Sequence, residues 1–335
     1  MKKLVLGLSA SLFSIFLSFE NNVYACTDFR LTAKDGTVIV TRSLEFAQDL
    51  KSELRSSNRD RVFSMAAPNG KPGLYWKAKY GYVFLDALNA DVAMDGMNEQ
   101  GLSVEILYLP GYAKYQAVPA NEETKVLPYA HFGDWVLSNF KTIDEVRAAL
   151  PNVYVVQEKT PGFGDTIFPV HYAIYDASGN GLVVEYVDGK MHVYDNKIGI
   201  MTNSPTYDWH LHNLANYTNL APVNPPEVID NGEKFGATGQ GFGMLGLPGD
   251  ISPPSRFVKT AVLTRTAIPA ADAVGELNLA EHIINNVDIP LGLARELQKG
   301  NQPTNDVTQW VVFKDLTNKK LYYRTYNDLT LRFFF

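Results

Sequence analysis

The sequence predicts an α+β fold in which antiparallel sheets are covered by helices on their outer sides. Segments of alternating apolar and polar residues, typical of strands, occur in groups at the start, in the middle and at the end of the chain. Segments with helical periodicity lie between these groups. Short turns join strands within a group, as in antiparallel hairpins, so we expect the helices to pack outside the sheets.

Composition is that of an ordinary globular protein. Of 335 residues, 46% are hydrophobic and 20% are charged. The net charge of -6, without any run of basic residues, argues against nucleic acid as a partner. A single cysteine excludes an internal disulfide, which a chain of this length does not need for stability.

The first 25 residues have the pattern of an export signal. Lys2 and Lys3 precede an apolar run from Leu4 to Phe19, and Val23 and Ala25 occupy the small-residue positions that a signal peptidase recognises. The run is shorter than the ~20 residues that a membrane-spanning helix needs. We therefore expect cleavage after Ala25, a periplasmic or secreted protein without a membrane anchor, and one domain over residues 26–335.

Cleavage at this position would make Cys26 the first residue of the mature protein. Its thiol is a nucleophile, and its α-amine, with a reference pKa of about 7.7–8.0, takes up the thiol proton near neutral pH. Two alternatives remain: a lipidated cysteine, as in a lipoprotein binding module, and an inert buried side chain. Polar residues at 20–22 and the bulky Tyr24 argue against a lipidation signal.

A hairpin is predicted directly after Cys26. Residues 27–33 and 37–42 alternate, and Lys34-Asp35-Gly36 between them has the chemistry of a tight turn. Arg42 ends the second strand and is therefore expected near Cys26, where a cation would lower the thiol pKa. The alternative for Arg42 and Glu45 is an ordinary surface ion pair.

The middle of the chain continues with strands and then helices. Residues 50–75 are polar and irregular, which indicates an exposed loop near the active face. The pattern then predicts strands at 80–85, 91–94 and 102–107, a turn at 97–101, and helices at 129–139 and 142–150. Thr142 and Glu145 form a capping box at the start of the second helix.

The last half of the chain repeats this order. A Pro/Gly-rich connection at 161–165 leads to a meander of strands at 170–175, 182–187 and 191–194, followed by a short strand at 198–201. Helices are expected at 208–217, 257–266 and 269–286, and closing strands at 310–313, 321–325 and 329–335.

A glycine-rich segment matches the dinucleotide-binding pattern only in its letters. In Gly241-Phe242-Gly243-Met244-Leu245-Gly246 no strand precedes the first glycine, and Pro248 follows where a helix should begin. We interpret the segment as a loop that shapes the wall of a pocket.

His210 and His212 raise the question of a metal site. Two residues apart on a helix they point to different faces, and no cluster of cysteines or carboxylates completes a ligand shell. We therefore expect no metal. The other histidines are interpreted as packing or surface residues: His131, His171, His192 and His282.

Asn203 lies in a tight turn over residues 201–205, after the short strand. An asparagine there serves either as a turn former or as an amide donor to an oxyanion that develops during acyl transfer.

Six motifs in the same order resemble those of the choloylglycine hydrolase family, which includes penicillin V acylases and conjugated bile salt hydrolases and belongs to the N-terminal-nucleophile hydrolases. The motifs are Cys26-Thr27, Arg42, Asp95-Gly96-Met97-Asn98-Glu99 with Gly101-Leu102, Leu107-Tyr108-Leu109-Pro110-Gly111, Thr202 to His210, and Gly246 to Asp250 leading to Ser255-Arg256-Phe257.

The resemblance implies an αββα four-layer sandwich that hydrolyses an amide bond without cofactor or metal. It assigns Cys26 as the nucleophile with its α-amine as base, Arg42 as the group that steadies the thiolate, and Glu45 as the residue that holds the amine. It places Asn203 and the backbone N–H of Tyr108 in the oxyanion hole, and Arg256 in the surrounding polar network. The resemblance also implies a homotetramer, the assembly that is common in the family.

Two departures bear on the substrate, which the resemblance implies to be a small N-acyl amide. Glu45 stands where the family usually has aspartate, and Tyr108 stands where many bile salt hydrolases have asparagine and penicillin V acylases tend to have tyrosine. Tyr108 therefore favours an aryloxyacetyl or fatty acyl amide, such as penicillin V or an acyl-homoserine lactone, over a conjugated bile salt. An apolar acyl group needs an apolar pocket, and the candidate lining residues, which could also be core residues, are Phe29, Phe46, Met65 and Tyr82.

Overall fold

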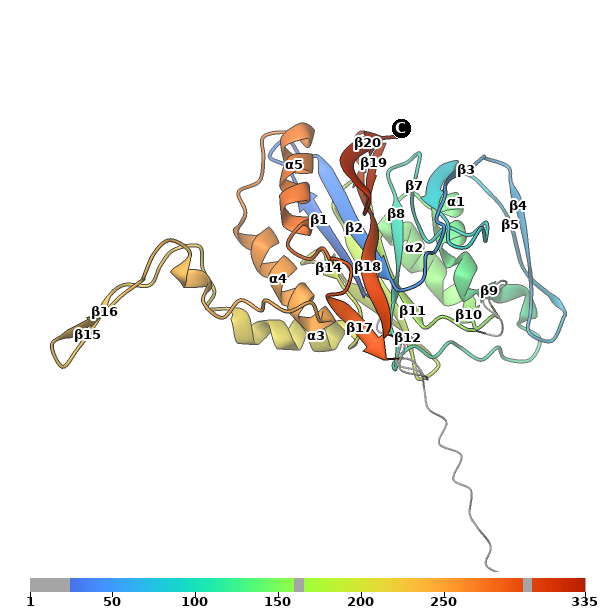
Figure 1. Ribbon diagram of the computed structural model, residues 1–335. Coiled ribbons are helices and arrows are strands. Elements are labelled where there is room, and N and C mark those ends of the chain that lie inside the picture. The colour runs from blue at the N-terminus through green and yellow to red at the C-terminus, as the bar shows by residue number, and fades with distance from the viewer. Residues whose placement is uncertain (1–24, 160–165, 298–302, 335) are drawn as a thin grey trace, which may run out of the picture.

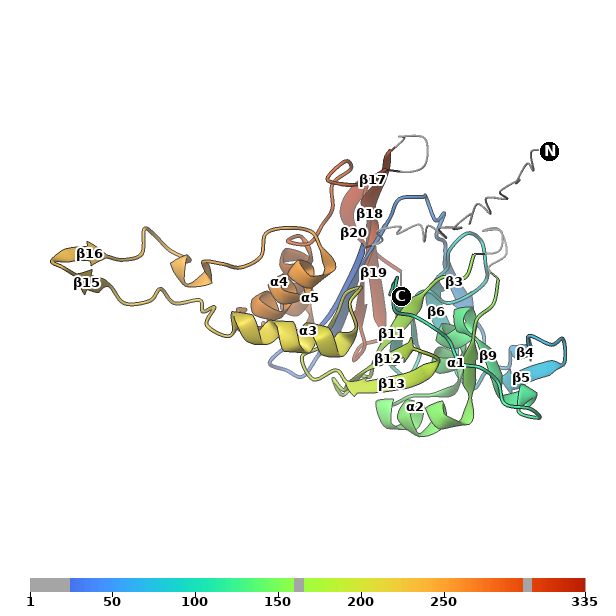
Figure 2. The same ribbon diagram turned by 90° about the horizontal axis from the view of Figure 1, so that it is seen from below.

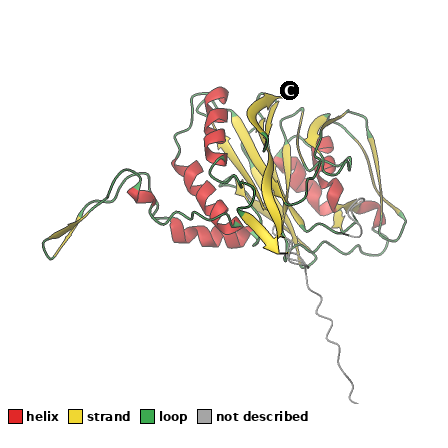
Figure 3. Ribbon diagram, viewed as in Figure 1, coloured by secondary structure: helices red, strands yellow, loops and turns green. Residues whose placement is uncertain are grey.

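Two antiparallel sheets lie face to face at the centre of the molecule, and helices cover both outer sides (Figures 1 and 3). The computed structural model describes residues 25–159, 166–297 and 303–334. The expected signal peptide, apart from Ala25, and the expected connection at 161–165 lie outside the described residues. The four layers confirm the αββα sandwich.

The first sheet carries the start and the end of the domain. Its strand order is β14-β1-β2-β18-β19-β20, and β17 pairs with β18. Helices α3, α4 and α5 cover its outer face (Figure 1). The bounds are β1 (Ala25–Thr32), β2 (Val38–Phe46), β14 (Ile200–Met201), β17 (Ala294–Leu297), β18 (Pro303–Asp315), β19 (Lys320–Thr325), β20 (Asp328–Phe333), α3 (Tyr207–Leu214), α4 (Pro253–Thr266) and α5 (Ala273–Ile284).

The second sheet is built from the middle of the chain in the order β13-β12-β11-β8-β7-β6-β3. Helices α1 and α2 cover its outer face, and Thr142 caps α2 by accepting a hydrogen bond from the Glu145 N–H, at 3.3 Å. The bounds are β3 (Leu54–Ser57), β6 (Tyr82–Leu85), β7 (Asp95–Asn98), β8 (Ser103–Tyr108), β11 (Val170–Tyr175), β12 (Gly181–Val187), β13 (Lys190–Asp195), α1 (Phe132–Asn139) and α2 (Ile143–Ala149).

Three pairs of short strands lie outside the two sheets: β4 (Val62–Ala66) with β5 (Pro72–Lys77), β9 (Val126–Pro128) with β10 (Tyr154–Val156), and β15 (Val228–Asp230) with β16 (Glu233–Phe235). None of the helices in the described part of the chain is long and apolar enough to cross a membrane.

Most predicted elements are present, and the errors have physical causes. The expected loop at 50–75 is wrong, because β3, β4 and β5 lie in it as short strands that alternate only weakly. The strand expected at 91–94 lies instead at β7, whose Asp95 and Asn98 are fully buried polar residues and so conceal the strand pattern. Helix α4 begins four residues earlier than predicted, with Pro253 in its first turn.

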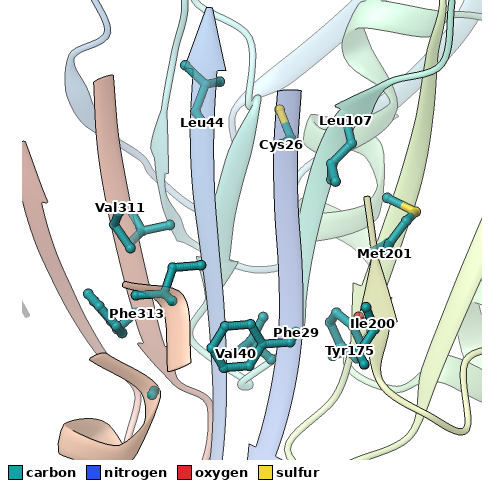
Figure 4. Close-up of a cluster of buried hydrophobic side chains, with 14 of the residues drawn as sticks. Cys26, Phe29, Val40, Leu44, Leu107, Tyr175, Ile200, Met201, Val311 and Phe313 are labelled. Carbon is teal, nitrogen blue, oxygen red and sulfur yellow. The ribbon is translucent and has the colours of Figure 1, made fainter. Parts of the chain in front are cut away.

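The interior between the sheets is mostly apolar, and Cys26 is part of it. Figure 4 shows Cys26 on its strand beside Leu44 and Leu107, with Val40 further along the same face of β2. The two central strands β1 and β2 are buried over nearly their whole length. A side chain of β1 that points between the sheets is therefore removed from bulk water.

A cluster of charged side chains crosses this apolar interior and joins the two sheets. Lys314 on β18 donates from Nζ to Asp95 Oδ1 at 2.5 Å and to Glu105 Oε1 at 2.6 Å, both on the second sheet. All three side chains are fully buried. Burial alone would lower the pKa of Lys314, but Asp95 and Glu105 raise it above its ordinary value. Lys314 therefore stays charged.

We predict that Lys314→Met lowers the free energy of unfolding by about 3–5 kcal/mol, because it leaves a buried carboxylate without its cation. The measurement is the urea unfolding curve of the purified protein. Lys320→Met, at an exposed position of the neighbouring strand, is the matched control and should change little. A loss below about 1 kcal/mol, the value of an exposed pair, would contradict the prediction.

Candidate active site

Cys26 lies at the beginning of β1, with its side chain directed between the two sheets. It pairs with Leu44 on β2, and only 4% of its surface is exposed. Side chains alternate along a strand, so Cys26 and Asp28 share one face of β1, and their partners Leu44 and Arg42 share the same face of β2. The hairpin thus brings Arg42 to the sulfur.

Arg42 is fully buried and holds the thiol in place by direct contact. Its Nη2 lies 3.6 Å from Cys26 Sγ and donates to the carbonyl of Ile106 at 2.6 Å. Its Nη1 donates to the Met94 carbonyl at 3.1 Å and lies 3.4 Å from Asp95 Oδ2. Burial would lower the pKa of Arg42, but Cys26 and Asp95 raise it above its ordinary value, so the cation that stabilises a thiolate is present.

Glu45 lies on the other face of β2. It pairs with Ala25, the residue before Cys26, and accepts a hydrogen bond from Thr308 Oγ1 at 2.9 Å. A register shift in β18 next to Thr308 allows this contact. Burial raises the pKa of Glu45 to about 7, although the charge of Arg256 opposes the shift. The surface ion pair considered for Arg42 and Glu45 is wrong, because both are fully buried.

Asn203 follows β14 and contacts the backbone of Cys26. Its Oδ1 accepts from the Cys26 backbone nitrogen at 2.7 Å and from Arg256 Nη2 at 2.8 Å. Its Nδ2 donates to the Tyr108 carbonyl at 2.8 Å. An amide group has two hydrogens, and no second acceptor for Nδ2 occurs among the described residues. Asn203 is therefore more than a turn former, and one donor remains for a substrate oxygen.

Arg256, from the buried face of α4, completes the surroundings of Cys26. Its Nη1 donates to the Cys26 carbonyl at 2.5 Å and to Thr27 Oγ1 at 2.6 Å. Burial lowers the pKa of Arg256, while Glu45 and Cys26 oppose that shift. The structure thus brings together all six predicted site residues: Cys26, Arg42, Glu45, Tyr108, Asn203 and Arg256.

A cavity of about 80 Å³ opens next to Cys26. Its walls are almost entirely apolar or aromatic, as an apolar acyl group requires. The lining residues are Cys26, Arg42, Leu44, Glu45, Phe46, Leu50, Ala87, Leu88, Ala90, Val92, Met94, Ile106, Leu107, Tyr108, Tyr129, Ala130, Phe168 and Val170.

Of the four predicted pocket residues, Phe46 lines this cavity and the other three do not. Phe29 is three residues from Cys26 on one strand, so it points to the opposite face and is fully buried. Tyr82 packs on the outer side of the second sheet and donates to Asp134 of α1 at 2.7 Å. Met65 lies on β4, which packs at the outer side of that sheet.

Two further expectations need correction. The glycine-rich segment does not line the cavity next to Cys26; it forms the base of a projecting arm, where Gly243 approaches the carbonyls of Ala221 and Val223 too closely for a Cβ. His171 is not an ordinary packing residue, because its ring bonds both Glu185 and the Thr202 carbonyl beside Asn203.

His210 is buried and His212 is exposed, so the two rings point apart. Among residues 25–159, 166–297 and 303–334 no group of three histidine, cysteine or carboxylate side chains has the arrangement of a metal site.

Comparison with known proteins agrees with this geometry. The profile of the family "Linear amide C-N hydrolases, choloylglycine hydrolase family" matches residues 26–334. A bile salt hydrolase/transferase of Clostridium perfringens is 33% identical over 311 residues, which cover 90% of each chain. A penicillin V acylase of Pectobacterium atrosepticum is 26% identical over 303 residues, which cover 85% of this chain and 73% of the relative.

Solved structures give the same result. A mutant of the conjugated bile acid hydrolase from Clostridium perfringens superposes with a TM-score of 0.80 at 30% identity, over 92% of both chains. The penicillin V acylase from Agrobacterium tumefaciens superposes with a TM-score of 0.72 at 26% identity, over 92% of this chain and 85% of the other. From its sequence, its four layers and the residues around Cys26, this chain belongs to the choloylglycine hydrolase family of linear amide C–N hydrolases.

Proposed function

We propose that the chain is an exported cysteine amidase that becomes active when cleavage after Ala25 turns Cys26 into its first residue. Three observations support this. Cys26 lines the apolar cavity and contacts Arg42, its backbone nitrogen is held by Asn203, and the family profile begins to match at Cys26. The observation that carries the proposal is the placement of one thiol between a cation and an amide donor.

The residues around Cys26 supply each group that acyl transfer requires. The thiolate, paired with Arg42, attacks the amide carbon, and the α-amine holds the thiol proton and delivers it to the leaving amine. Nδ2 of Asn203 and a backbone N–H at Tyr108 donate to the oxyanion. Water then cleaves the thioester, releases the acid and restores Cys26. Before cleavage the Cys26 nitrogen is an amide and is no base.

The cavity favours a slender acyl group. At about 80 Å³ it is far smaller than the roughly 300–1,000 Å³ of sites that enclose whole drug-sized ligands. A rigid steroid would have to displace wall residues such as Phe46 and Phe168, whereas an alkyl chain or an aryloxyacetyl group enters end-on. We therefore propose penicillin V-like amides or N-acyl-homoserine lactones as substrates, with conjugated bile salts as the alternative.

We predict that the exported protein hydrolyses penicillin V or an N-acyl-homoserine lactone with a kcat/KM at least about 10-fold above that for a conjugated bile salt, a difference of about 1.4 kcal/mol in transition-state binding. The measurement assays one preparation on all three substrates. Cys26→Ala should abolish every activity and keep the melting temperature, since the side chain is small. A conjugated bile salt as the best substrate contradicts the proposed acyl group, and activity that survives in Cys26→Ala contradicts the mechanism.

Glu45 is the group that we propose anchors the new α-amine. In the chain that retains Ala25, Oε1 of Glu45 is bonded to Thr308, while Oε2 has no partner in the described part of the chain. Its pKa of about 7 means that the folded state binds a proton more tightly than the unfolded state, in which the ordinary value is 4.5. An α-ammonium group next to Glu45 would stabilise the carboxylate and lower this pKa.

We predict that the free energy contributed by Glu45 is complete below about pH 4.5 and is lost as the pH rises through about 7, by up to about 3 kcal/mol. Glu45→Gln should therefore gain stability relative to the unprocessed wild type across this window. The measurement compares urea unfolding of both proteins at several pH values, with exposed Glu233→Gln as control. The gain should shrink in the processed form; an equal gain in both forms would show that Glu45 does not hold the amine.

A projecting arm supports self-association. We name residues 221–243 the arm; it extends away from the sandwich and ends in the β15–β16 hairpin (Figures 1 and 2). The Ala221 N–H donates to the Gly243 carbonyl at 3.0 Å and closes its base. Val228, Ile229 and Phe235 at its tip are 59%, 65% and 61% exposed. An isolated two-stranded hairpin is marginally stable in water, so we propose that a second copy covers the arm in a homo-oligomer, the expected homotetramer.

We predict that Phe235→Glu shifts the protein to a smaller assembly, because a charge at the tip opposes burial of the arm. The measurement is the molar mass from light scattering after size-exclusion chromatography. Tyr75→Glu changes an aromatic residue that is equally exposed, at 64%, on a different surface, and should keep the wild-type mass. A wild-type protein that is already monomeric at micromolar concentration would contradict the proposal.

A further inference from the structure

Two buried histidines hold consecutive carbonyl groups of the segment that carries Asn203. His171 Nε2 lies 3.0 Å from the Thr202 carbonyl, and His210 Nε2 lies 2.8 Å from the Asn203 carbonyl. The two rings are 1% and 2% exposed. A carbonyl oxygen can only accept a hydrogen bond, so each Nε2 carries a hydrogen and donates it.

Both rings are themselves fixed from the layers on either side. His171, on β11, has its Nδ1 2.9 Å from Glu185 Oε1 on β12. The same carboxylate accepts a hydrogen bond from the backbone N–H of Tyr207 at 3.0 Å. Tyr207 is the first residue of α3, the helix that carries His210. The ring of His210 stacks on Phe257, with centroids 4.5 Å apart and planes 13° apart. Phe257 is the neighbour of Arg256, so one network connects the second sheet, α3 and α4.

The consequence for Asn203 is a fixed orientation. Its backbone carbonyl is held by His210, and its side-chain Oδ1 is held by Arg256 and by the Cys26 nitrogen. With both ends fixed, Nδ2 can point in only one direction, which is what an oxyanion donor needs in order to avoid reorganisation during the reaction. Burial lowers the pKa of His210 to about 4, so its ring is a neutral donor near neutral pH.

We propose that His210 is a positioning residue that aligns Asn203 with the oxyanion of the transition state, and that His171 holds the same turn from the side of the second sheet. The proposal rests on the proposed amidase function. Neither histidine touches the substrate, and both act through Asn203.

The test separates the hydrogen bond of His210 from its packing. His210→Phe keeps a ring to stack on Phe257 but has no donor, whereas His210→Gln keeps a side-chain N–H close to the position of Nε2. We expect His210→Phe to lower kcat on the best N-acyl amide substrate by about 10- to 100-fold with KM within about 2-fold, because the lost alignment matters in the transition state. His210→Gln should stay within about 3-fold of the wild type. His212→Phe, on the exposed face of the same helix, is the matched control and should leave kcat unchanged.

A double variant tests whether His210 acts through Asn203. Loss of an oxyanion donor costs about 10²–10³ in kcat, which sets the expected effect of Asn203→Ala. In that background His210→Phe should lower kcat no further, because the group that it positions is gone. A full additional loss would overturn the proposal, as would wild-type kcat in His210→Phe or equal losses in the Phe and Gln variants.

The corresponding His171→Phe and His171→Gln pair should behave in the same way. If His171→Phe does not fold, because it leaves Glu185 buried without its ring partner, the His210 variants decide. A wild-type protein that hydrolyses none of the three N-acyl amides would contradict the proposed function itself; an active wild type with a fully active His210→Phe would contradict only this inference.

Discussion

The hydrogen bond from the Cys26 backbone nitrogen to Asn203 is the contact on which the site depends. It is 2.7 Å long and fully buried, and it fixes the atom that we propose becomes the catalytic amine. Arg256 reinforces it from α4 by bonding both the Cys26 carbonyl and Asn203 Oδ1. The strand β1 is hydrogen-bonded on both sides, to β2 from Ala25 onward and to β14 at Asp28 and Phe29, which holds Cys26 in a fixed position. If cleavage after Ala25 makes Cys26 the first residue, as we propose, the fold holds in place a terminus that would otherwise be mobile.

The β1–β2 hairpin also separates two groups of charges. On the face between the sheets, Arg42 contacts the sulfur and is linked through Asp95 to Lys314. On the opposite face, Glu45 accepts a hydrogen bond from Thr308, and the positive charge of Arg256 favours its ionised form. Interactions between charges are stronger in a buried site than in water. One face is therefore suited to stabilising a thiolate, and the other to holding an ammonium group on the same residue.

The sequence pattern predicts helix-covered antiparallel sheets, and the family motifs add the four layers and the five residues around Cys26. Only the contact between Cys26 and Arg42 follows from local pattern. Alternation along two short segments and one Asp-Gly turn determine the hairpin, and the hairpin alone brings Arg42 to Cys26. Asn203 and Arg256 come from distant segments, and only the family motifs identified them. The pocket was predicted less well. Phe29 is expected near the active face, but its odd spacing from Cys26 on one strand places its side chain on the other face.

Residues that act by holding other residues in place leave little pattern in the sequence. Lys314 lies one residue beyond the strand predicted at 310–313, whereas β18 continues to Asp315. The predicted strand therefore gave no direction for the side chain of Lys314. The alternation Val312, Lys314 would have shown a lysine at an interior position. His171 and His210 bond backbone carbonyls, and no spacing in the sequence records such a contact. The arm has no alternating core pattern, because its side chains are exposed in the single chain.

The central claim is that one residue supplies both the nucleophile and the base, and the intact mass of the exported protein tests it most directly. The account predicts the mass of residues 26–335 with an unmodified amine on Cys26. A chain that begins at any other residue, or a diacylglyceryl adduct on Cys26, would contradict it.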